Sequence, residues 1–509
     1  MRKGELLQFV CGKRKSGGRQ YSHEKDRGAN EVEPGRHEGR EREGVLRKDA
    51  PGKLSRQDRF EKNPSFVSTK QRPFWCGIAG LIGLLFWSPR RAPPACMLDD
   101  VASCLVFLMN PLRSIFLPLI ALFAVGFSQG AEKPLKVFIL AGQSNMQGHA
   151  HVRTFEHLGM DPETVPLLEK MQNEDGTPRG IENVWISSIG SSDSEKVGQL
   201  TAGYGSEARG PKIGPEFTFG IFAEEALDQP ILLIKTAWGG KSIHTDFRSP
   251  GAGSYVFSEQ QIENFKKKGK SLEEAQKEKA EATGHYYRLM TDHVKNVLSD
   301  IGRVYPDYDE SAGYELAGFV WFQGWNDMVD SGTYPNRGKA GGYDAYSEVL
   351  AHFIRDVRKD LNAPKMPFVI GVLGVGGPVE KYGPKQQRYA DTHRNFRMAM
   401  AAPAKLPEFE GNVTAVLTEN YWDLELTALK AKENEVRQEM KNLVSKGKLS
   451  KEQEKAEYEK LRAERLTEEE RKKLETGISN AEFHYLGSAR IMAGIGKGFA
   501  EAVVELQSK

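Results

Sequence analysis

The chain has 509 residues, of which 28% are charged, and its formal net charge is only +2. This length exceeds what one hydrophobic core usually needs, so we expect one large domain with appendages or two smaller domains. The balanced charge gives no electrostatic reason to expect a nucleic-acid partner.

The first part of the chain has a different composition from the rest. Up to about residue 70 it is rich in Arg, Lys, Glu and Gly and has almost no apolar periodicity, which predicts disorder. The pattern of a new protein start appears only later, at Met97 or Met109. We therefore interpret residues 1–108 as a disordered extension that follows from a misassigned start.

Residues 109–130 have the form of a secretory signal peptide. A short basic stretch precedes an apolar run over 115–125, and small residues come before Ala131. The run is shorter than the roughly 20 residues of a spanning helix, so we expect no stable membrane anchor after cleavage. A secreted or periplasmic protein is predicted. It would contain no disulfide and no thiolate metal site, because every cysteine precedes Ala131: Cys11, Cys76, Cys96 and Cys104.

Beyond residue 131, short apolar segments alternate with longer amphipathic ones. Strands that are apolar throughout and joined by long connections are typical of a parallel sheet covered on both faces. Apolar residues at three- and four-residue spacing indicate helices between them. The predicted fold is an α/β sandwich. Its strands are expected at 137–140, 231–234, 319–322, 368–373 and 413–417, and its helices at 216–227, 285–298, 343–361 and 486–506.

Two highly charged stretches interrupt this alternation. Residues 262–282 contain a helix start at Ser271, and residues 425–476 contain two more, at Ser450 and Thr467. Sparse leucines and many charges in the second stretch predict a projecting helical hairpin with solvated faces. The functional alternative is a docking arm for a protein partner or a lid over the site.

Ser144 follows the first predicted strand, in the sequence Gly142-Gln-Ser-Asn-Met146. A serine at the carboxyl end of a buried strand is a candidate nucleophile, because open α/β sheets carry their chemistry at that edge. The alternative is a simple turn, in which Ser and Asn are common. Two further loops favour the catalytic interpretation, because each also follows a predicted strand.

The second loop holds Gly239 and Gly240, and the third holds Gln323-Gly-Trp-Asn326-Asp327. Glycine lets backbone amides approach a ligand, and a side-chain amide can donate to a developing oxyanion without being ionised. The alternative for Asn326 and Asp327 is a helix cap. We favour a site built from all three loops.

His484 lies directly before the last predicted helix. A serine hydroxyl is a weak nucleophile until a base removes its proton, and histidine suits that task near neutral pH. The other histidines lack a comparable setting, although His149 and His244 are close enough in sequence to the site loops to touch substrate.

Together these motifs resemble the blocks of the SGNH (GDSL-like) hydrolase superfamily, and more narrowly the carbohydrate acetylesterases of the sialate O-acetylesterase and acetylxylan esterase type. The likeness spans roughly 135–506 apart from the two charged stretches. It implies a three-layer sandwich with a central parallel, flavodoxin-like sheet, so that residues 131–509 form one esterase domain with two helical insertions. Gly214-Pro-Glu216 also resembles a segment beside the site in these enzymes.

The resemblance assigns the site residues by position. Ser144 is the nucleophile and His484 the base, and the oxyanion hole consists of Gly240, Asn326 and the Ser144 amide. Either Gly239 or Gly240 supplies the glycine amide. Gln143, Gln323 and Gly239 are the expected substrate-binding residues.

The chain departs from the family pattern at the acid. The family aspartate normally lies three positions before the histidine, where this chain has Ala481. Glu482 and Asp327 are near-equal candidates to orient His484. A backbone carbonyl or a Ser-His dyad without an acid are the alternatives, since loss of the orienting acid lowers the rate without abolishing the chemistry.

The predicted function is that of an exported serine esterase that removes acetyl groups from carbohydrate hydroxyls. No metal and no organic cofactor is implied. An acyltransferase or lipid esterase on the same scaffold is one alternative, and a catalytically inactive carbohydrate-binding or interaction protein is another. Trp238, Trp321 and Trp325 flank the loops, where they could stack on a sugar or simply pack.

Overall fold

The computed structural model describes residues 133–508, except 193 and 448. The expected extension, the expected signal peptide and the four cysteines lie outside these residues. Within the described part of the chain, no helix is both long enough and apolar enough to cross a membrane.

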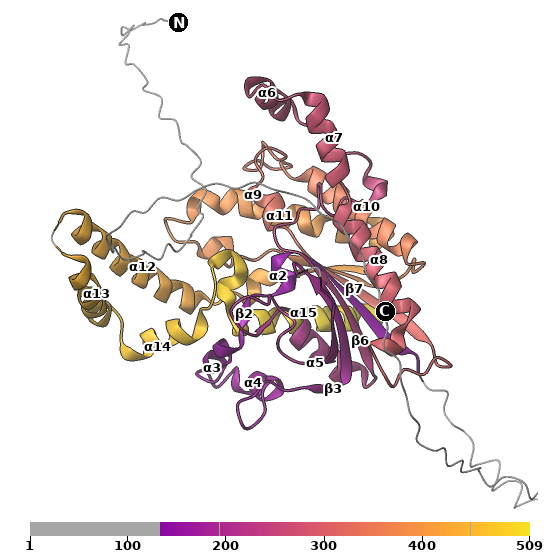
Figure 1. Ribbon diagram of the computed structural model, residues 1–509, viewed down its shortest axis with the longest axis horizontal. Coiled ribbons are helices and arrows are strands. Elements are labelled where there is room, and N and C mark those ends of the chain that lie inside the picture. The colour runs from indigo at the N-terminus through magenta and orange to yellow at the C-terminus, as the bar shows by residue number, and fades with distance from the viewer. Residues whose placement is uncertain (1–132, 193, 448, 509) are drawn as a thin grey trace, which may run out of the picture. The chain divides into compact units, whose positions relative to one another are not determined.

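A seven-stranded sheet with the order β4-β3-β6-β1-β7-β8-β9 forms the centre of the domain (Figure 1). Adjacent strands are parallel except for β3 and β4, which pair antiparallel at one edge. The strands are β1 (Leu135–Gly142), β3 (Ile181–Gly190), β4 (Lys196–Leu200), β6 (Ile231–Ala237), β7 (Tyr314–Phe322), β8 (Phe368–Val372) and β9 (Val413–Leu417). A separate two-stranded ribbon pairs β2 (Ala150–His151) with β5 (Lys212–Ile213).

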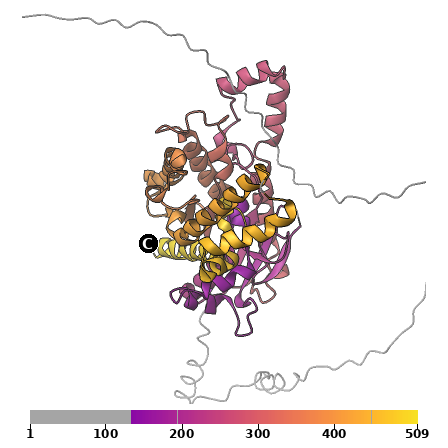
Figure 2. The ribbon, with the colours of Figure 1, turned by 90° about the vertical axis from the view of Figure 1, so that its left-hand side faces the viewer.

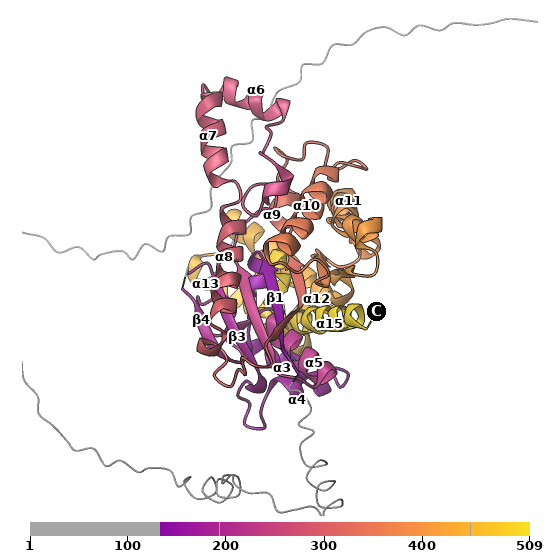
Figure 3. The same cartoon turned by 90° about the vertical axis from the view of Figure 1, so that its right-hand side faces the viewer.

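Helices cover both faces of the sheet, which explains why the central strands are apolar throughout. On β7, Phe322 packs on Phe499 of α15, while Trp321 packs on Phe353 of α10. Successive side chains of the strand therefore pack against helices on opposite faces of the sheet. Figure 3 shows α5 and α15 along one side of the sheet. The covering helices are α5 (Glu216–Leu227), α8 (His285–Ser299), α10 (Asp344–Asp360), α11 (Ala390–Ala401) and α15 (Ala489–Gln507).

The order of the strands brings three loops to one edge. Strand β1 lies between β6 and β7, and the residues paired at their carboxyl ends are Gly142 with Ala237 and Gly142 with Phe322. This is the point where the chain switches from building one half of the sheet to building the other, which is where open α/β sheets form clefts. The three loops that follow Gly142, Ala237 and Phe322 are therefore neighbours.

Two helical insertions extend from the sandwich. The first is α6 (Glu259–Lys267) with α7 (Leu272–Ala282), and Figures 1 and 3 show it beyond the helix α8. The second is α12 (Leu424–Ser445), α13 (Lys451–Arg465) and α14 (Glu468–Gly477), drawn in gold and facing the viewer in Figure 2. Ser271, Ser450 and Thr467 are the N-caps of α7, α13 and α14, as the sequence predicts.

The α/β sandwich, its five predicted strands and its four predicted helices are confirmed. The sequence analysis missed the strands β3 and β4, because their mixed polar sequences show neither a continuous apolar run nor clean alternation. It also missed α11, whose arginines and methionines obscure its apolar stripe. The remaining short helices are α2 (Ser144–Gln147), α3 (Phe155–Leu158), α4 (Val165–Met171) and α9 (Trp325–Val329).

Candidate active site

Ser144 is the first residue of the single helical turn α2, which begins directly after β1. Gln143 has an extended backbone and precedes the turn, and the amides of Gln147 and Gly148 close it onto the carbonyls of Gln143 and Ser144. Ser144 is 8% exposed. Its backbone amide is at the start of a helical turn, where amides have no partner within the helix. The serine hydroxyl and this amide are thus presented at the edge of the sheet.

Glycines on either side of α2 permit this sharp turn. A Cβ at Gly142 would lie 2.1 Å from the carbonyl oxygen of Phe322, so no side chain fits there. Gly148 has φ 91°, and a Cβ there would lie 2.2 Å from Gly214 Cα. Close backbone approach, together with positive φ at Gly148, therefore requires glycine at both positions.

A hydrogen-bond chain fixes the side-chain amide of Asn326. The backbone N–H of Gly324 donates to Gln143 Oε1 over 2.9 Å, which identifies that atom as the oxygen. Gln143 Nε2 then donates to Asn326 Oδ1 over 3.1 Å. The Asn326 amide group Nδ2 is consequently left free to donate elsewhere. An uncharged donor is thereby oriented beside α2.

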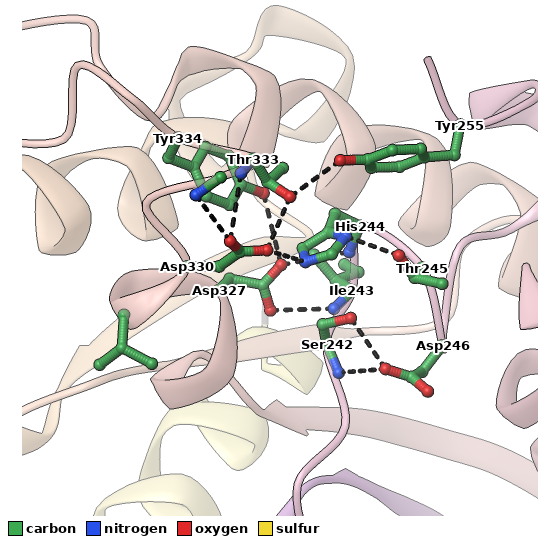
Figure 4. Close-up of polar contacts among 12 residues, drawn as sticks. Ser242, Ile243, His244, Thr245, Asp246, Tyr255, Asp327, Asp330, Thr333 and Tyr334 are labelled. Carbon is green, nitrogen blue, oxygen red and sulfur yellow. Dashed lines mark hydrogen bonds and ion pairs between the residues drawn. The ribbon is translucent and has the colours of Figure 1, made fainter. Parts of the chain in front are cut away.

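Gln323 and Asp327 take part in the same network, deep in the protein. Gln323 Nε2 donates to Gln143 Oε1 and to Asp327 Oδ2, and both side chains are almost fully buried. Asp327 also accepts from the amides of Ile243 and His244 (Figure 4). Burial raises the pKa of Asp327, and these hydrogen bonds oppose the rise. Its carboxylate thus ties α9 to the loop after β6.

His244 and Asp330 extend this connection. His244 Nε2 lies 3.1 Å from Asp330 Oδ2, and His244 Nδ1 lies 2.7 Å from Thr245 Oγ1 (Figure 4). Although burial opposes it, the contacts with His244 and Thr333 hold the pKa of Asp330 well below its usual range. The loops after β6 and β7 are therefore bound to each other by two carboxylates, Asp327 and Asp330.

The two glycines after β6 differ in their hydrogen bonding. The amide of Gly239 donates to Ser191 Oγ over 3.0 Å, so this donor is already occupied. A Cβ on Gly239 would lie 3.9 Å from Ser144 Cβ, which puts this residue next to the serine. Gly240 has φ +74° and open space around the Cβ position. Of the two amides, that of Gly240 is the better candidate donor to a ligand.

A buried ion pair holds the carboxyl end of α2. Lys235 on β6 donates to Glu216 Oε2 over 2.7 Å and to the carbonyl of Gln147, the last residue of α2. Glu216 in turn accepts from the amide of Gly214. Burial lowers the pKa of Lys235, and Glu216 counteracts that shift. This pair gives the Gly214-Pro-Glu216 segment a physical role in holding the turn that carries the serine.

His484 lies on a turn with unusual backbone angles. Tyr485 and Leu486 both have positive φ, at 51° and 59°, and both side chains are buried. The Tyr485 hydroxyl accepts from the amide of Gly374 and is 2.7 Å from Thr418 Oγ1. Non-glycine residues in this conformation cost energy and persist where packing over-determines them. The buried anchors on the carboxyl side of His484 fix where its ring lies.

The partner of His484 is Asn480. The amide of Ala481 donates to Asn480 Oδ1 over 2.7 Å, so that atom is the oxygen, and His484 Nδ1 lies 3.0 Å from it. Nδ1 must then carry the proton, which leaves Nε2 as the basic nitrogen. Burial lowers the pKa of His484 to about 4, so the ring is neutral at pH 7.

Neither carboxylate proposed from the sequence contacts His484. The carboxylate of Glu482 accepts from Gln386. The carboxylate of Asp327 accepts from Gln323 and from the amide of Ile243. The reason for Glu482 is geometric, because at the start of the turn Glu482–Gly487 its carboxylate reaches Gln386 on a separate loop and not the imidazole. The orienting oxygen instead comes from Asn480, four positions before the histidine.

His149 stacks on His484. Their ring centroids are 3.8 Å apart and the planes differ by 6°. His149 Nε2 is buried and has no hydrogen-bond partner among the described residues. Burial, followed by the nearby His484 and two lysines, lowers the pKa of His149 to about 3. The His484 ring is thus covered on one face by a second neutral imidazole.

The structure brings together most of the residues that the sequence nominates. The turn α2 contacts the turn Glu482–Gly487, and Gln143 joins Ser144 to the Asn326 loop. Within the described residues Ser144 Oγ makes no hydrogen bond to His484, as is common before substrate binds. The amides of Gln143 and Gln323 are occupied by protein partners, which suits positioning better than substrate binding.

Two residues of the site, Asn480 and Ser191, were not predicted from the sequence, and His149 was expected near the substrate but not stacked on His484. Asn480 was not predicted because a carboxylate or a backbone carbonyl was expected, whereas the strained turn brings a side-chain amide oxygen to the ring. No described group of three or more His, Cys, Asp or Glu residues could hold a metal ion.

No curated protein sequence matches this chain. A solved structure from Arabidopsis thaliana is 18% identical, covers 56% of this chain and 86% of its own, and has a TM-score of 0.30. A carbohydrate acetylesterase from Xanthomonas citri is 13% identical with the same TM-score, and the match covers 56% of this chain and about half, 51%, of that protein.

The family comparison covers more than half of the chain. Residues 134–409 match the family described as carbohydrate esterase, sialic acid-specific acetylesterase. The matched region contains Ser144, the two glycines after β6 and Asn326, and it ends before His484. The chain therefore belongs to this family of carbohydrate esterases and is a carboxylic ester hydrolase.

Proposed function

We propose that the chain removes O-acetyl groups from carbohydrates through an acyl-serine intermediate. Ser144 Oγ attacks the ester carbonyl while His484 Nε2 takes its proton. His484 then returns the proton to the departing sugar hydroxyl. Water, activated by the same nitrogen, releases acetate and restores the serine.

The observation that carries this proposal is the hydrogen bond from His484 to Asn480. It holds the proton on Nδ1 and leaves the lone pair on Nε2, which is the tautomer a general base needs. Asn480 supplies orientation without a negative charge. The imidazolium formed during catalysis is therefore less stabilised than with an aspartate, which is consistent with a base whose pKa is already low.

The oxyanion would be held by the free amide group of Asn326 and the backbone amides of Ser144 and Gly240. Asn326 is supported by the Gln143 chain, which leaves only Nδ2 available. Donors that are fixed before the reaction do not have to reorganise when negative charge develops.

Two aromatic side chains next to His484, the proposed base, form a surface for the sugar. Trp325 and Phe483 lie 5.7 Å apart, Phe483 lies 4.4 Å from His484, and Phe483 is 41% exposed. By contrast, Trp238 and Trp321 are only 2% and 0% exposed and belong to the core. Aromatic faces of this kind suit the apolar face of a sugar ring, so we assign the platform to Trp325 and Phe483.

The test is hydrolysis of a small aryl acetate and of a long-chain aryl ester by the full chain. We expect acetate-selective turnover that falls by at least about a thousandfold in Ser144→Ala. Ser299→Ala, an exposed serine on α8, is the matched control and should keep wild-type turnover. Preference for the long chain would favour the lipid esterase, and turnover equal in wild type and Ser144→Ala would favour the inactive binding protein.

We also propose that the protein is exported, on the basis of the signal-like sequence at 109–130. Mass spectrometry of the N-terminus of the mature protein tests this. A first residue near Ala131 is expected, and a mature chain that retains residues 1–108 would contradict it.

A further inference from the structure

A groove of about 710 Å³ lies between the first insertion and the sandwich. Its walls come from α7, from the start of α8 and from the loop between β6 and α6. The residues used in the argument below are Arg248, Ser249, Tyr255, Phe257, Lys279 and Arg288. This volume is within the range of binding sites for small molecules, roughly 300 to 1,000 Å³. None of these residues belongs to the catalytic machinery proposed above.

Three cationic side chains line the groove together with one carboxylate, and the charges of Asp330 and Asp246 also act on Lys279. Arg248, Lys279 and Arg288 all line it, and none forms an ion pair with a carboxylate among the described residues. Arg248 donates instead to the backbone carbonyls of Ala252 and Gly253, which shapes the loop but leaves its charge unneutralised. The lining carboxylate, Asp360, accepts from the hydroxyl of Tyr287. Three cations at one cavity favour an anionic ligand.

The groove also has aromatic walls and an unused hydroxyl. Tyr255 and Phe257 are half-buried and their rings are 5.3 Å apart. Lys279 Nζ lies 4.4 Å above the Tyr255 ring. Ser249 is 1% exposed, and its Oγ has no hydrogen-bond partner among the described residues. Apolar ring faces beside cations and a hydroxyl match the groups of a sugar that carries a carboxylate.

Hydrogen bonds connect the groove to the candidate active site. Lys279 donates to Thr245 Oγ1, which is the partner of His244. The Tyr255 hydroxyl lies 2.9 Å from Thr333 Oγ1, which donates to Asp330 at the end of α9 (Figure 4). The helix α9 carries Asn326. The groove and the oxyanion donor are thus built on the same pair of loops.

We propose that this groove is a second carbohydrate subsite that binds a carboxylate-bearing sugar residue of the same glycan chain whose acetyl group is removed at Ser144. The inference rests on the proposed function for its link to catalysis. Arg288, which is exposed, and Lys279 would contact the carboxylate, and Tyr255 with Phe257 would contact the ring. Arg248 and Ser249 form the floor. The enzyme therefore selects acetylated polymers that contain acidic sugars.

Binding is tested with probes that carry no acetyl group, so that it is measured independently of hydrolysis. Trigalacturonate is the anionic probe and a neutral galactose trisaccharide its counterpart, each titrated calorimetrically into the full chain. We expect the anionic probe to bind at least about tenfold tighter, with a preference that shrinks at high salt. Arg288→Gln and Lys279→Gln should each weaken its binding by about three- to tenfold.

Matched controls are Lys277→Gln on α7 and Lys295→Gln on α8, both exposed and outside the groove. They should bind both probes as the wild type does. Equal affinity for the two probes, or equal losses in groove and control variants, would overturn the inference. A chain that binds trigalacturonate selectively but fails to hydrolyse aryl acetate would leave the subsite standing and overturn the proposed function.

Discussion

The edge of the sheet and the α12–α14 insertion hold their polar groups in different ways. At the edge, Gln143, Gln323 and Asp327 are almost fully buried, and each is committed to partners from other loops. In the insertion, exposed or half-exposed pairs such as Lys432 with Glu470 join neighbouring helices. Small apolar clusters lie beneath these pairs: Leu429, Leu466 and Leu474, and Val436, Met440 and Leu461.

This difference determines how strongly each region depends on any single polar contact. Buried polar groups lose much when one partner is removed, because the other is left desolvated and unpaired. Exposed ion pairs contribute little individually, typically below about 1 kcal/mol. We therefore expect single substitutions to have large effects at the edge of the sheet and small effects in the insertion.

The largest effect is expected from Lys235→Met, which leaves Glu216 charged and buried. Removing one partner of a buried pair costs about 3 to 5 kcal/mol of unfolding free energy, and denaturant unfolding measures it. The double variant Lys235→Met with Glu216→Leu should recover much of this loss. Lys277→Met on the exposed face of α7 is the control. Similar losses in the single and double variants would argue against a coupled pair.

Asn326→Ala should lower kcat by roughly 100- to 1,000-fold, because it removes one oxyanion donor. KM should change little, since the ground-state ester carries less charge on its oxygen. Steady-state kinetics on an aryl acetate measures both constants, with the exposed Asn336→Ala as control. A change in KM alone would assign Asn326 to ground-state binding instead.

The third prediction concerns pH and the His149–His484 stack. In the proposed mechanism a neutral His484 acts as the base, so kcat/KM should fall as the pH drops through its pKa of about 4. His149→Ala lets water reach the ring, which should move this midpoint upward toward 6.5, the ordinary value for histidine. His149→Phe keeps the stacked cover and should keep the midpoint low. An unchanged profile in His149→Ala would restrict His149 to packing.

The smallest effect is expected in the insertion, at the capping box of α13. Ser450→Ala removes a side-chain acceptor for the Gln453 amide and should cost about 1 kcal/mol locally. Hydrogen exchange should quicken in the first turn of α13, and aryl acetate turnover should stay at the wild-type value. Loss of turnover would mean that the insertion and the site are coupled.

The same comparison explains what could be read from the sequence. Helix caps and apolar runs act within a few residues of the chain, so the insertion helices and the central strands are predictable from local patterns. Ser144, Asn326 and His484 could be nominated from the sequence because each lies in or beside a recognisable motif. The Asn480 contact, the His149 stack and the Asp327 links depend on loops from distant segments meeting, and no local pattern encodes such a meeting.

The position of His484 near the end of the chain also affects synthesis. The hydroxyl of Ser479 bonds to the carbonyl of His149, 330 residues earlier, and Thr218 bonds to the carbonyl of Ala493 on α15. During translation at ~10 residues per second, the serine turn would therefore wait on the order of half a minute for its base. Under the proposed mechanism, the nascent chain has no base for Ser144 until His484 and the helix α15 that follows it have emerged, so a product terminated before His484 should not hydrolyse esters.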